Sequence, residues 1–245
     1  MAIETWLGSG HVSLRAYGST VPFERVGNCS RLEFNINEQT IELKDHTSPG
    51  GGTYDEVRRI DSVEMGMTLH DLNTANLARV LYADFSTVAS ATAIAEAHTA
   101  ALGKVIALAK MPLTITSVKS ADDVTTYVAD TDYSLTGAGL YIPADSSIPA
   151  AATVNVVYVC ADYDVIEALT TAGLAYELMF EGMNEGGTNK RSNIKVYRVR
   201  IGAAQGLNWI GEEFAALEVT GKLLKDPTKT GVGKSTYFRV EKEAA

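Results

Sequence analysis

The amino-acid sequence predicts a mainly β protein, an antiparallel β-sandwich or barrel with two short α-helices and a small inserted β domain. The clearest strand signal ends at Leu69, where Val63, Met65, Met67 and Leu69 alternate with mostly polar residues, the period of a half-buried strand. Similar short alternating runs recur along the chain, and turn-forming residues separate them. Only two short stretches carry helical spacing, so β structure forms the frame.

Composition and charge narrow the function classes. The 245 residues are 46% hydrophobic, enough for a sizeable core. Against 21 Lys and Arg stand 30 Asp and Glu, so the net charge of −9 disfavours tight binding to nucleic acid or an anionic membrane. Two cysteines are too few for a disulfide scaffold, and neither a signal peptide nor a membrane span is indicated. We therefore expect a soluble protein made in a reducing cytoplasm, without membrane insertion.

Three segments are expected along the chain. Residues 1–110 and 162–245 form the first and second parts of the main domain, and residues 111–161 form the inserted β domain. In the insertion charge thins out, and short extended runs alternate with turns. Three of the six prolines lie there: Pro112, Pro143 and Pro149.

Strands open the first part, at Val12–Ala16 and Leu32–Ile36, before the strand that ends at Leu69. A short helix follows, with Asn73 as its N-cap and apolar residues at helical spacing after it. Residues 86–103 are rich in Ala and Thr and are compatible with helix or strand. We favour a partly extended segment that leads into a strand at residues 105–108.

The second part is predicted to begin with a helix over Val165–Ala172. Asp164 and Glu167 have capping-box spacing, and Gly173 can end the helix. Strands then follow, and their apolar residues alternate with polar ones. They are expected within Tyr176–Phe180, Ile194–Ile201, Leu217–Leu223 and Thr236–Val240.

The stretch Leu43–Arg59 does not fit a compact monomer. Pro49 followed by Gly50, Gly51 and Gly52 cannot hold a helix or a central strand, and charged residues flank these glycines. A long connection of this kind inside a compact domain is usually functional or disordered. We expect a loop-like arm that becomes ordered when it meets another subunit.

Catalytic motifs are scarce. The run Thr230–Thr236 ends in GKST, but Thr228 stands where a phosphate loop needs glycine, and a strand pattern follows, so a solvated turn is expected. The histidines lack metal-ligand spacing, and His70-Asp71 is interpreted as part of a strand-to-helix junction rather than an acid–base pair. The expectation is a protein with no catalytic residues, no metal site and no cofactor.

Several runs resemble tail tube (major tail) proteins of tailed bacteriophages, over nearly the whole chain. They are GNCSRLEF (Gly27–Phe34), DHTSPGGG (Asp45–Gly52), LHDLNTANLA (Leu69–Ala78), YEL (Tyr176–Leu178), FEG (Phe180–Gly182) and DPTKTG (Asp226–Gly231). The resemblance implies a tail-tube β-sandwich whose hexameric rings join their sheets into one β-barrel. Stacked rings form a hollow tube that conducts DNA during ejection.

The resemblance also implies partners, locations and contact residues. The subunit would bind itself, a tail-tip or baseplate initiator, a tape measure protein and a tail terminator, while DNA transits the lumen without specific binding. It would assemble in the host cytoplasm and reside in the virion tail. Met1–Ser9 and Lys234–Ala245 would reach the neighbouring ring. The inter-ring arm would comprise Asp45, His46, Ser48, Pro49, Gly50, Gly51, Gly52, Tyr54, Asp55, Arg58 and Arg59.

Two further expectations depend on this reading. Carboxylates lining the lumen would repel DNA phosphates, and the candidates are Glu33, Glu38, Glu42 and Glu64; an ordinary solvated outer face is the alternative. An insertion that projects outward would compete with a sheath for the space around the tube. This favours a long non-contractile tail over the inner tube of a contractile tail. A carbohydrate- or receptor-binding β-sandwich, with exposed Tyr127, Tyr133 and Tyr141 as its platform, is the alternative of a different class.

Overall fold

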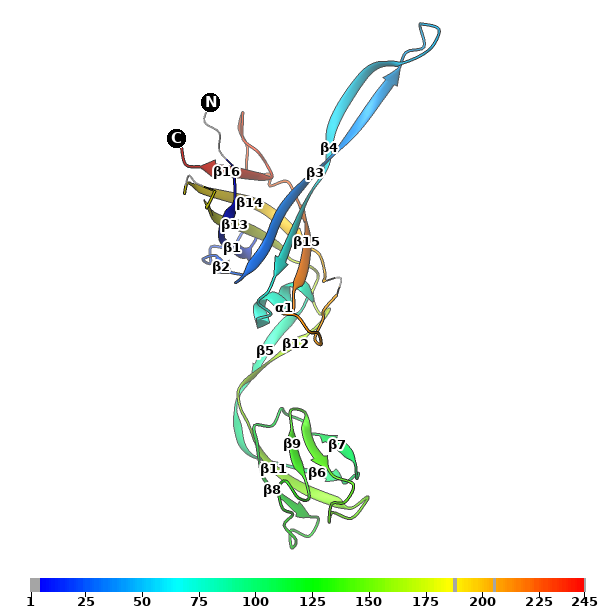
Figure 1. Cartoon of the computed structure of the whole chain (residues 1–245), viewed down its shortest axis with the longest axis vertical. Coiled ribbons are helices and arrows are strands. Elements are labelled where there is room, and N and C mark those ends of the chain that lie inside the picture. Colours follow the sequence, from blue (N-terminus) through cyan, green and yellow to red (C-terminus); the bar gives the residue numbers. More distant parts are fainter. Residues whose placement is uncertain (1–4, 187–188, 205, 245) are drawn as a thin grey trace. The chain divides into compact units, whose positions relative to one another are not determined.

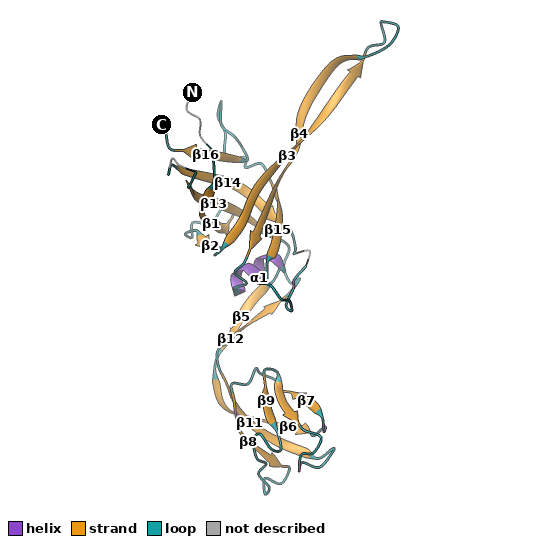
Figure 2. Ribbon diagram, in the orientation of Figure 1, coloured by secondary structure: helices purple, strands orange, loops and turns teal. Residues whose placement is uncertain are grey.

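The computed structural model describes residues 5–186, 189–204 and 206–244 (Figure 1). Within these residues the chain forms sixteen strands and one helix (Figure 2). It divides into two compact units, one of Met1–Asp84 with Ile166–Ala245 and one of Phe85–Val165. The second unit begins before and ends after the expected 111–161, and it begins earlier because the Ala- and Thr-rich segment and the residues after it form strands within it.

The first unit is built on one eight-stranded antiparallel sheet in the order β2-β1-β13-β14-β15-β4-β3, with β16 also paired to β14. Since β15 pairs with Val199–Ile201 of β14 and β16 with Ser192–Val196, the two short strands share one side of β14. The strands are β1 (Gly8–Ala16), β2 (Glu24–Arg25), β3 (Cys29–Lys44), β4 (Thr53–Leu69), β13 (Ala175–Asn184), β14 (Arg191–Ile201), β15 (Leu217–Leu223) and β16 (Phe238–Lys242).

Side chains along these strands alternate between the two faces of the sheet, and those on one face form a single hydrophobic core. Val63, Met65, Met67 and Leu69 are all buried, as the sequence pattern predicted. The sheet is not a closed barrel, because β2 and β3 end its strand order without pairing to each other. Across the sheet, Phe34 of β3 stacks on Phe238 of β16 with ring centroids 5.5 Å apart.

The single helix, α1 (Thr74–Val80), closes one end of this core. Asn73 is its N-cap, as expected, and its side chain accepts a hydrogen bond from the backbone N–H of Asn76. The Asn76 side chain is itself buried and donates to the carbonyls of Val26 and Asp71, both at 2.8 Å. One amide group therefore joins the helix to the loops before β3 and before α1.

The second expected helix, Val165–Ala172, is absent. Its first residues lie in β12 (Tyr163–Glu167), which pairs with β5 (Asp84–Val88). Asp164 accepts a hydrogen bond from Thr87 instead of capping a helix, and the backbone N–H of Leu169 donates to the carbonyl of Leu81. Pairing with a segment about 80 residues away in the chain replaces the local helical bonds, which the capping-box pattern could not reveal.

The second unit packs two three-stranded sheets around its own core. One has the order β6-β11-β8 and the other β7-β10-β9, all antiparallel. Tyr158, Leu140 and Ile142 are fully buried at its centre. The strands are β6 (Ala91–Thr99), β7 (Lys104–Ala107), β8 (Thr114–Ser120), β9 (Ser134–Thr136), β10 (Gly139–Ile142) and β11 (Thr153–Cys160).

A carboxylate of β6 is the centre of one polar cluster in the second unit. Glu96 accepts hydrogen bonds from the Tyr158 hydroxyl, the Ala109 backbone N–H and the His98 ring. Partial burial alone would raise the pKa of Glu96, but these bonds together lower it below its ordinary value of 4.5. Burial and the bond to Glu96 raise the pKa of Tyr158 to about 12.

We expect Asn76→Ala to lower the free energy of unfolding by about 1–3 kcal/mol, because the carbonyl of buried Val26 and the partly buried carbonyl of Asp71 both lose their donor. Chemical denaturation followed by circular dichroism measures this loss. Asn208→Ala, at an exposed position, serves as the matched control and should change stability little. Equal stabilities of the two variants would contradict the anchoring role of Asn76.

We expect Glu96→Gln to destabilise the protein by about 1–2 kcal/mol near neutral pH. The folded-state pKa of Glu96 is lowered, so its stabilisation is present above 4.5 and is lost as the pH falls through the folded pKa. The difference from wild type should therefore shrink on acidification. Thermal melts across pH measure it, with exposed Asp145→Asn as control. A difference that does not change with pH would contradict this assignment.

Candidate assembly surface

The distal half of the β3–β4 hairpin forms an arm, defined here as residues 35–61. All its residues are exposed except Asp45, which is half-buried. The strands pair with each other out to Lys44 and Thr53, so only residues 45–52 form the connecting loop (Figure 1). The expected loop over Leu43–Arg59 was therefore too long: residues 53–59 belong to β4, because cross-strand bonds continue the ladder that begins in the core.

The loop at the tip of the arm holds its shape with local hydrogen bonds. The Asp45 carboxylate accepts from the backbone N–H and the hydroxyl of Thr47, both at 2.7 Å. These bonds lower the pKa of Asp45 below its ordinary value. Gly50, Gly51 and Gly52 have φ angles of 107°, 67° and 143°, which L side chains rarely adopt. The glycine run is thus required by the backbone of the turn.

A β-bulge separates the arm from the body of the sheet. Asn37 pairs with Ser62, but Glu38 pairs with Ile60, so Asp61 is an extra residue on β4. The bulge shifts the alternation of β4 by one residue. Val57 therefore lies opposite Ile41 on the face that continues the non-core side of β3.

The arm exposes much apolar surface. Ile41, Leu43 and Val57 fall on the same face, whereas the ion pairs Lys44–Glu42 and Arg58–Glu56 occupy the other. A free chain leaves these apolar side chains in water, which marks an interaction surface. The six large apolar side chains of the arm are between 46% and 68% exposed: Ile36, Ile41, Leu43, Tyr54, Val57 and Ile60.

The four proposed lumen carboxylates do not form one acidic strip. By strand alternation Glu33 lies on the non-core face of β3, while Glu38 and Glu42 lie on the other. Glu64 pairs opposite Asn35 and so joins Glu33. The bulge at Asp61, which no sequence pattern indicated, lies between Glu64 and the arm. Along β3, odd-numbered Glu33 lies on one face of the strand, and even-numbered Glu38 and Glu42 lie on the other.

The face that carries Glu33 and Glu64 is also not acidic. The shallow groove there is lined by three basic side chains beside these two carboxylates. The cross-strand register places Arg200, Lys222 and Glu64 in one row. Mixed charges on this face fit a contact surface better than a purely repulsive lining.

Both edges of the eight-stranded sheet are open. Within the described residues, strand β3 pairs with β4 alone, and β2 pairs only with Ser13 and Leu14 of β1. Unpaired backbone groups on an edge strand are a template for pairing with another chain. The sheet therefore has two edges on which a further strand can pair.

The proposed terminal arms are less extended than expected. Residues 1–4 lie outside the described residues, and Leu7 is hydrogen-bonded to Asn184 at the end of β13. In the C-terminal stretch, β16 folds back on β14, and the backbone N–H of Glu243 donates to the carbonyl of Arg191. From residue 5 to residue 244, both terminal stretches are thus attached to the sheet of their own chain.

Sequence reasoning missed a basic pocket on the non-core face of β13 and β14, beside the connection between β15 and β16. Its half-buried aromatic walls are Phe23 and Tyr197, with the Lys229 ammonium 5.3 Å from the Tyr197 ring centroid. The cluster of basic residues around the TKTGVGKS run was the available signal. The basic pocket is defined by Arg15, Lys195, Lys229, Lys234 and Arg239.

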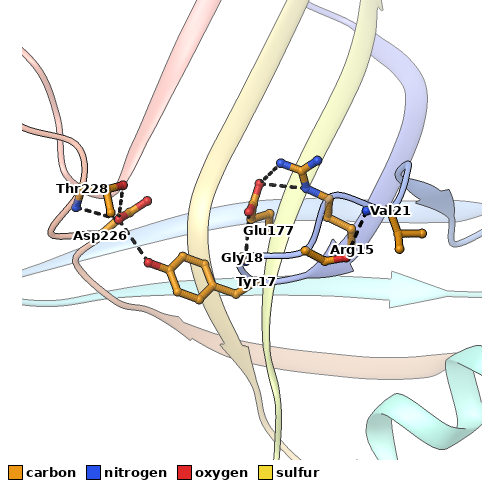
Figure 3. A network of polar contacts seen from close by, with 8 residues as sticks. Arg15, Tyr17, Gly18, Val21, Glu177, Asp226 and Thr228 are labelled. Carbon is orange, nitrogen blue, oxygen red and sulfur yellow. Dashed lines mark hydrogen bonds and ion pairs between the residues drawn. The ribbon is translucent and has the colours of Figure 1, made fainter.

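The carboxylates around the basic pocket already have partners (Figure 3). Glu177 accepts from the Arg15 guanidinium at 2.6 and 3.0 Å, and Asp226 accepts from the Tyr17 hydroxyl and from Thr228. Burial alone would raise the pKa of Asp226, but the hydrogen bonds and the charge of Lys229 lower it below its ordinary value. This ionised carboxylate holds the connection in place beside the pocket.

The two sequence motifs considered above, His70-Asp71 and Thr230–Thr236, lie at a strand-to-helix junction and in a turn. His70 contacts Ser30, and Asp71 accepts from the backbone of Asn28, so the two adjacent residues have separate partners. The Thr230–Thr236 run is a turn that leads into β16, without a helix. Among the residues that the structure describes, no group of three or more His, Cys, Asp or Glu side chains could hold a metal ion.

The tyrosine platform of a carbohydrate-binding module is also not formed. Tyr127 and Tyr133 are buried, and Tyr141 is half-buried, so the expected exposure of these rings was wrong. Tyr127 and Tyr133 belong to the hydrophobic core of the second unit, where their rings contribute to its packing.

Among the described residues, no helix is long and apolar enough to cross a membrane. A comparison with curated proteins finds no match. A comparison with protein families matches residues 5–241, nearly the whole chain, to a family described as "Protein of unknown function UCP028589". The exposed arm and the open-edged sheet are therefore features of a member of this family, to which the chain belongs.

Proposed function

We propose that the chain is a self-assembling structural subunit of a bacteriophage tail tube. The observation that carries the proposal is the arm, a long paired hairpin that leaves the core and exposes apolar residues along its length. An isolated two-stranded hairpin is at best marginally stable in water, so burial against another surface would stabilise this arm. The sequence runs that resemble those of tail tube proteins support the same proposal.

The open sheet supplies the second support. Ring closure of identical copies would pair each exposed edge with its neighbour and remove the aggregation hazard of unpaired strands. Rotational head-to-tail contacts close a ring, and contacts along the axis stack rings into a tube. In this arrangement the edges act within a ring, and the arm acts between rings.

The proposed role is structural and uses no cofactor. Hexameric rings would stack into a hollow tube in the virion tail, and DNA would pass through during ejection without specific binding. A tail-tip initiator, a tape measure protein and a terminator would set where the tube starts and ends. The separate second unit favours a non-contractile tail, because an additional compact unit outside the tube would compete with a sheath.

Negative-stain electron microscopy of the concentrated protein should show six-fold rings or hollow tubes. A variant with Glu38–Asp61 replaced by Asn-Gly should form no tubes and should stop at single rings, with an unchanged melting temperature. Apart from half-buried Asp45, the removed residues are exposed, and the two-residue turn closes the Asn37–Ser62 pair.

Surface variant Asp145→Ala, outside the arm, is the control and should assemble as wild type does. Tubes formed by the shortened variant would show that the arm is not the stacking element. Wild-type protein that remains monomeric at every concentration, with and without a purified tail-tip complex, would contradict self-assembly.

A further inference from the structure

The connection between β14 and β15 exposes large apolar side chains that no described part of the chain covers. In residues 206–216, Trp209 is 68%, Ile210 91% and Phe214 97% exposed. Single exposed apolar residues are ordinary on protein surfaces, but three within six positions mark an interaction site. Aromatic residues of this kind supply much of the energy at protein interfaces.

The same connection is purely acidic. Its only charged residues are Glu212 and Glu213, both exposed. We refer to residues 206–216 as the acidic-aromatic loop. A partner surface should therefore combine positive charge with apolar or aromatic walls.

The basic pocket of the same chain has this chemistry. Five basic side chains surround the half-buried rings of Phe23 and Tyr197, in a protein whose net charge is −9. Glu241 is shared between Lys195 and Arg239, and among the described residues Lys229 and Lys234 have no carboxylate within ion-pair distance. The pocket thus retains positive charge that a second carboxylate pair can neutralise.

The loop and the pocket cannot meet within one copy. The acidic-aromatic loop enters one end of β15, before Leu217, and Lys229 and Lys234 follow the other end, after Leu223 (Figure 1). Seven extended residues separate the two ends by roughly 20 Å. No residue of the loop lines the pocket of its own chain.

We propose that the acidic-aromatic loop of one copy docks into the basic pocket of a second copy. Glu212 and Glu213 pair with Lys229 and Lys234, while Trp209 or Phe214 packs against the rings of the pocket. Because donor and acceptor lie at opposite ends of β15, the contact is head-to-tail and repeats from copy to copy. The inference rests on the proposed self-assembly and specifies one contact within it.

Charge reversal tests the contact in full-length protein. Glu212→Lys with Glu213→Lys gives a donor variant, and Lys229→Glu with Lys234→Glu gives an acceptor variant. Sedimentation velocity over a concentration series at low salt should show association at least about tenfold weaker for each variant alone. An equimolar mixture of the two should recover association, because each reversed surface then finds a reversed partner. A chain with all four substitutions should recover it as well.

Recovery by the mixture also excludes misfolding as the cause of the single-variant losses. Asp145→Lys, in the second unit, is a charge-reversal control and should associate as wild type does. Wild-type association should weaken as salt increases.

Three results would overturn the inference. If wild type assembles and both charge-reversal variants assemble with the same constant, the docking contact is wrong while self-assembly stands. If wild type never associates, the docking contact fails together with the proposed function. If the acceptor variant keeps its association but loses binding to a single-stranded oligonucleotide that wild type binds, the pocket takes phosphates instead of the loop.

Discussion

The continuous β3–β4 ladder is the constraint on which the rest of the first unit depends. At one end it supplies Met65 and Met67 to the core and the pairing partner for β15; at the other it is the whole arm. Because the same two strands run through both parts, burial at the base stabilises and orients a hairpin that could not persist alone. The bulge at Asp61 then decides which arm residues share a face.

The first unit combines a closed core with unsatisfied surfaces. Among the described residues these surfaces are its two open sheet edges, the apolar face of the arm, the acidic-aromatic loop and the basic pocket, and in the proposed assembly a second copy covers them. Unpaired backbone groups at a sheet edge are satisfied by another strand, an exposed apolar face is stabilised by burial, and a positively charged pocket is neutralised by carboxylates. Self-complementarity of this kind is what heterologous assembly of identical subunits requires.

Local patterns predicted those features whose cause is local. Alternation identified the buried face of β4, Asn73 was correctly chosen as the N-cap of α1, and the glycine run marked a turn that needs positive φ angles. Elsewhere, contacts between residues that are distant in the sequence determined the structure, and the local pattern predicted it wrongly. The capping box at Asp164 became part of β12, and Tyr127 and Tyr133 went into a core instead of onto a surface.

The sequence by itself determined the β class, the position of the arm and the shortage of catalytic motifs, because periodicity, turn chemistry and residue type are properties of neighbours in the chain. Only the tertiary structure decided the register of the arm, the split of the four carboxylates between two faces and the gathering of Arg15, Lys195 and Lys234 in one pocket. These three features depend on a bulge and on pairing between strands that are far apart in the sequence. The patterns of a single sequence reveal neither.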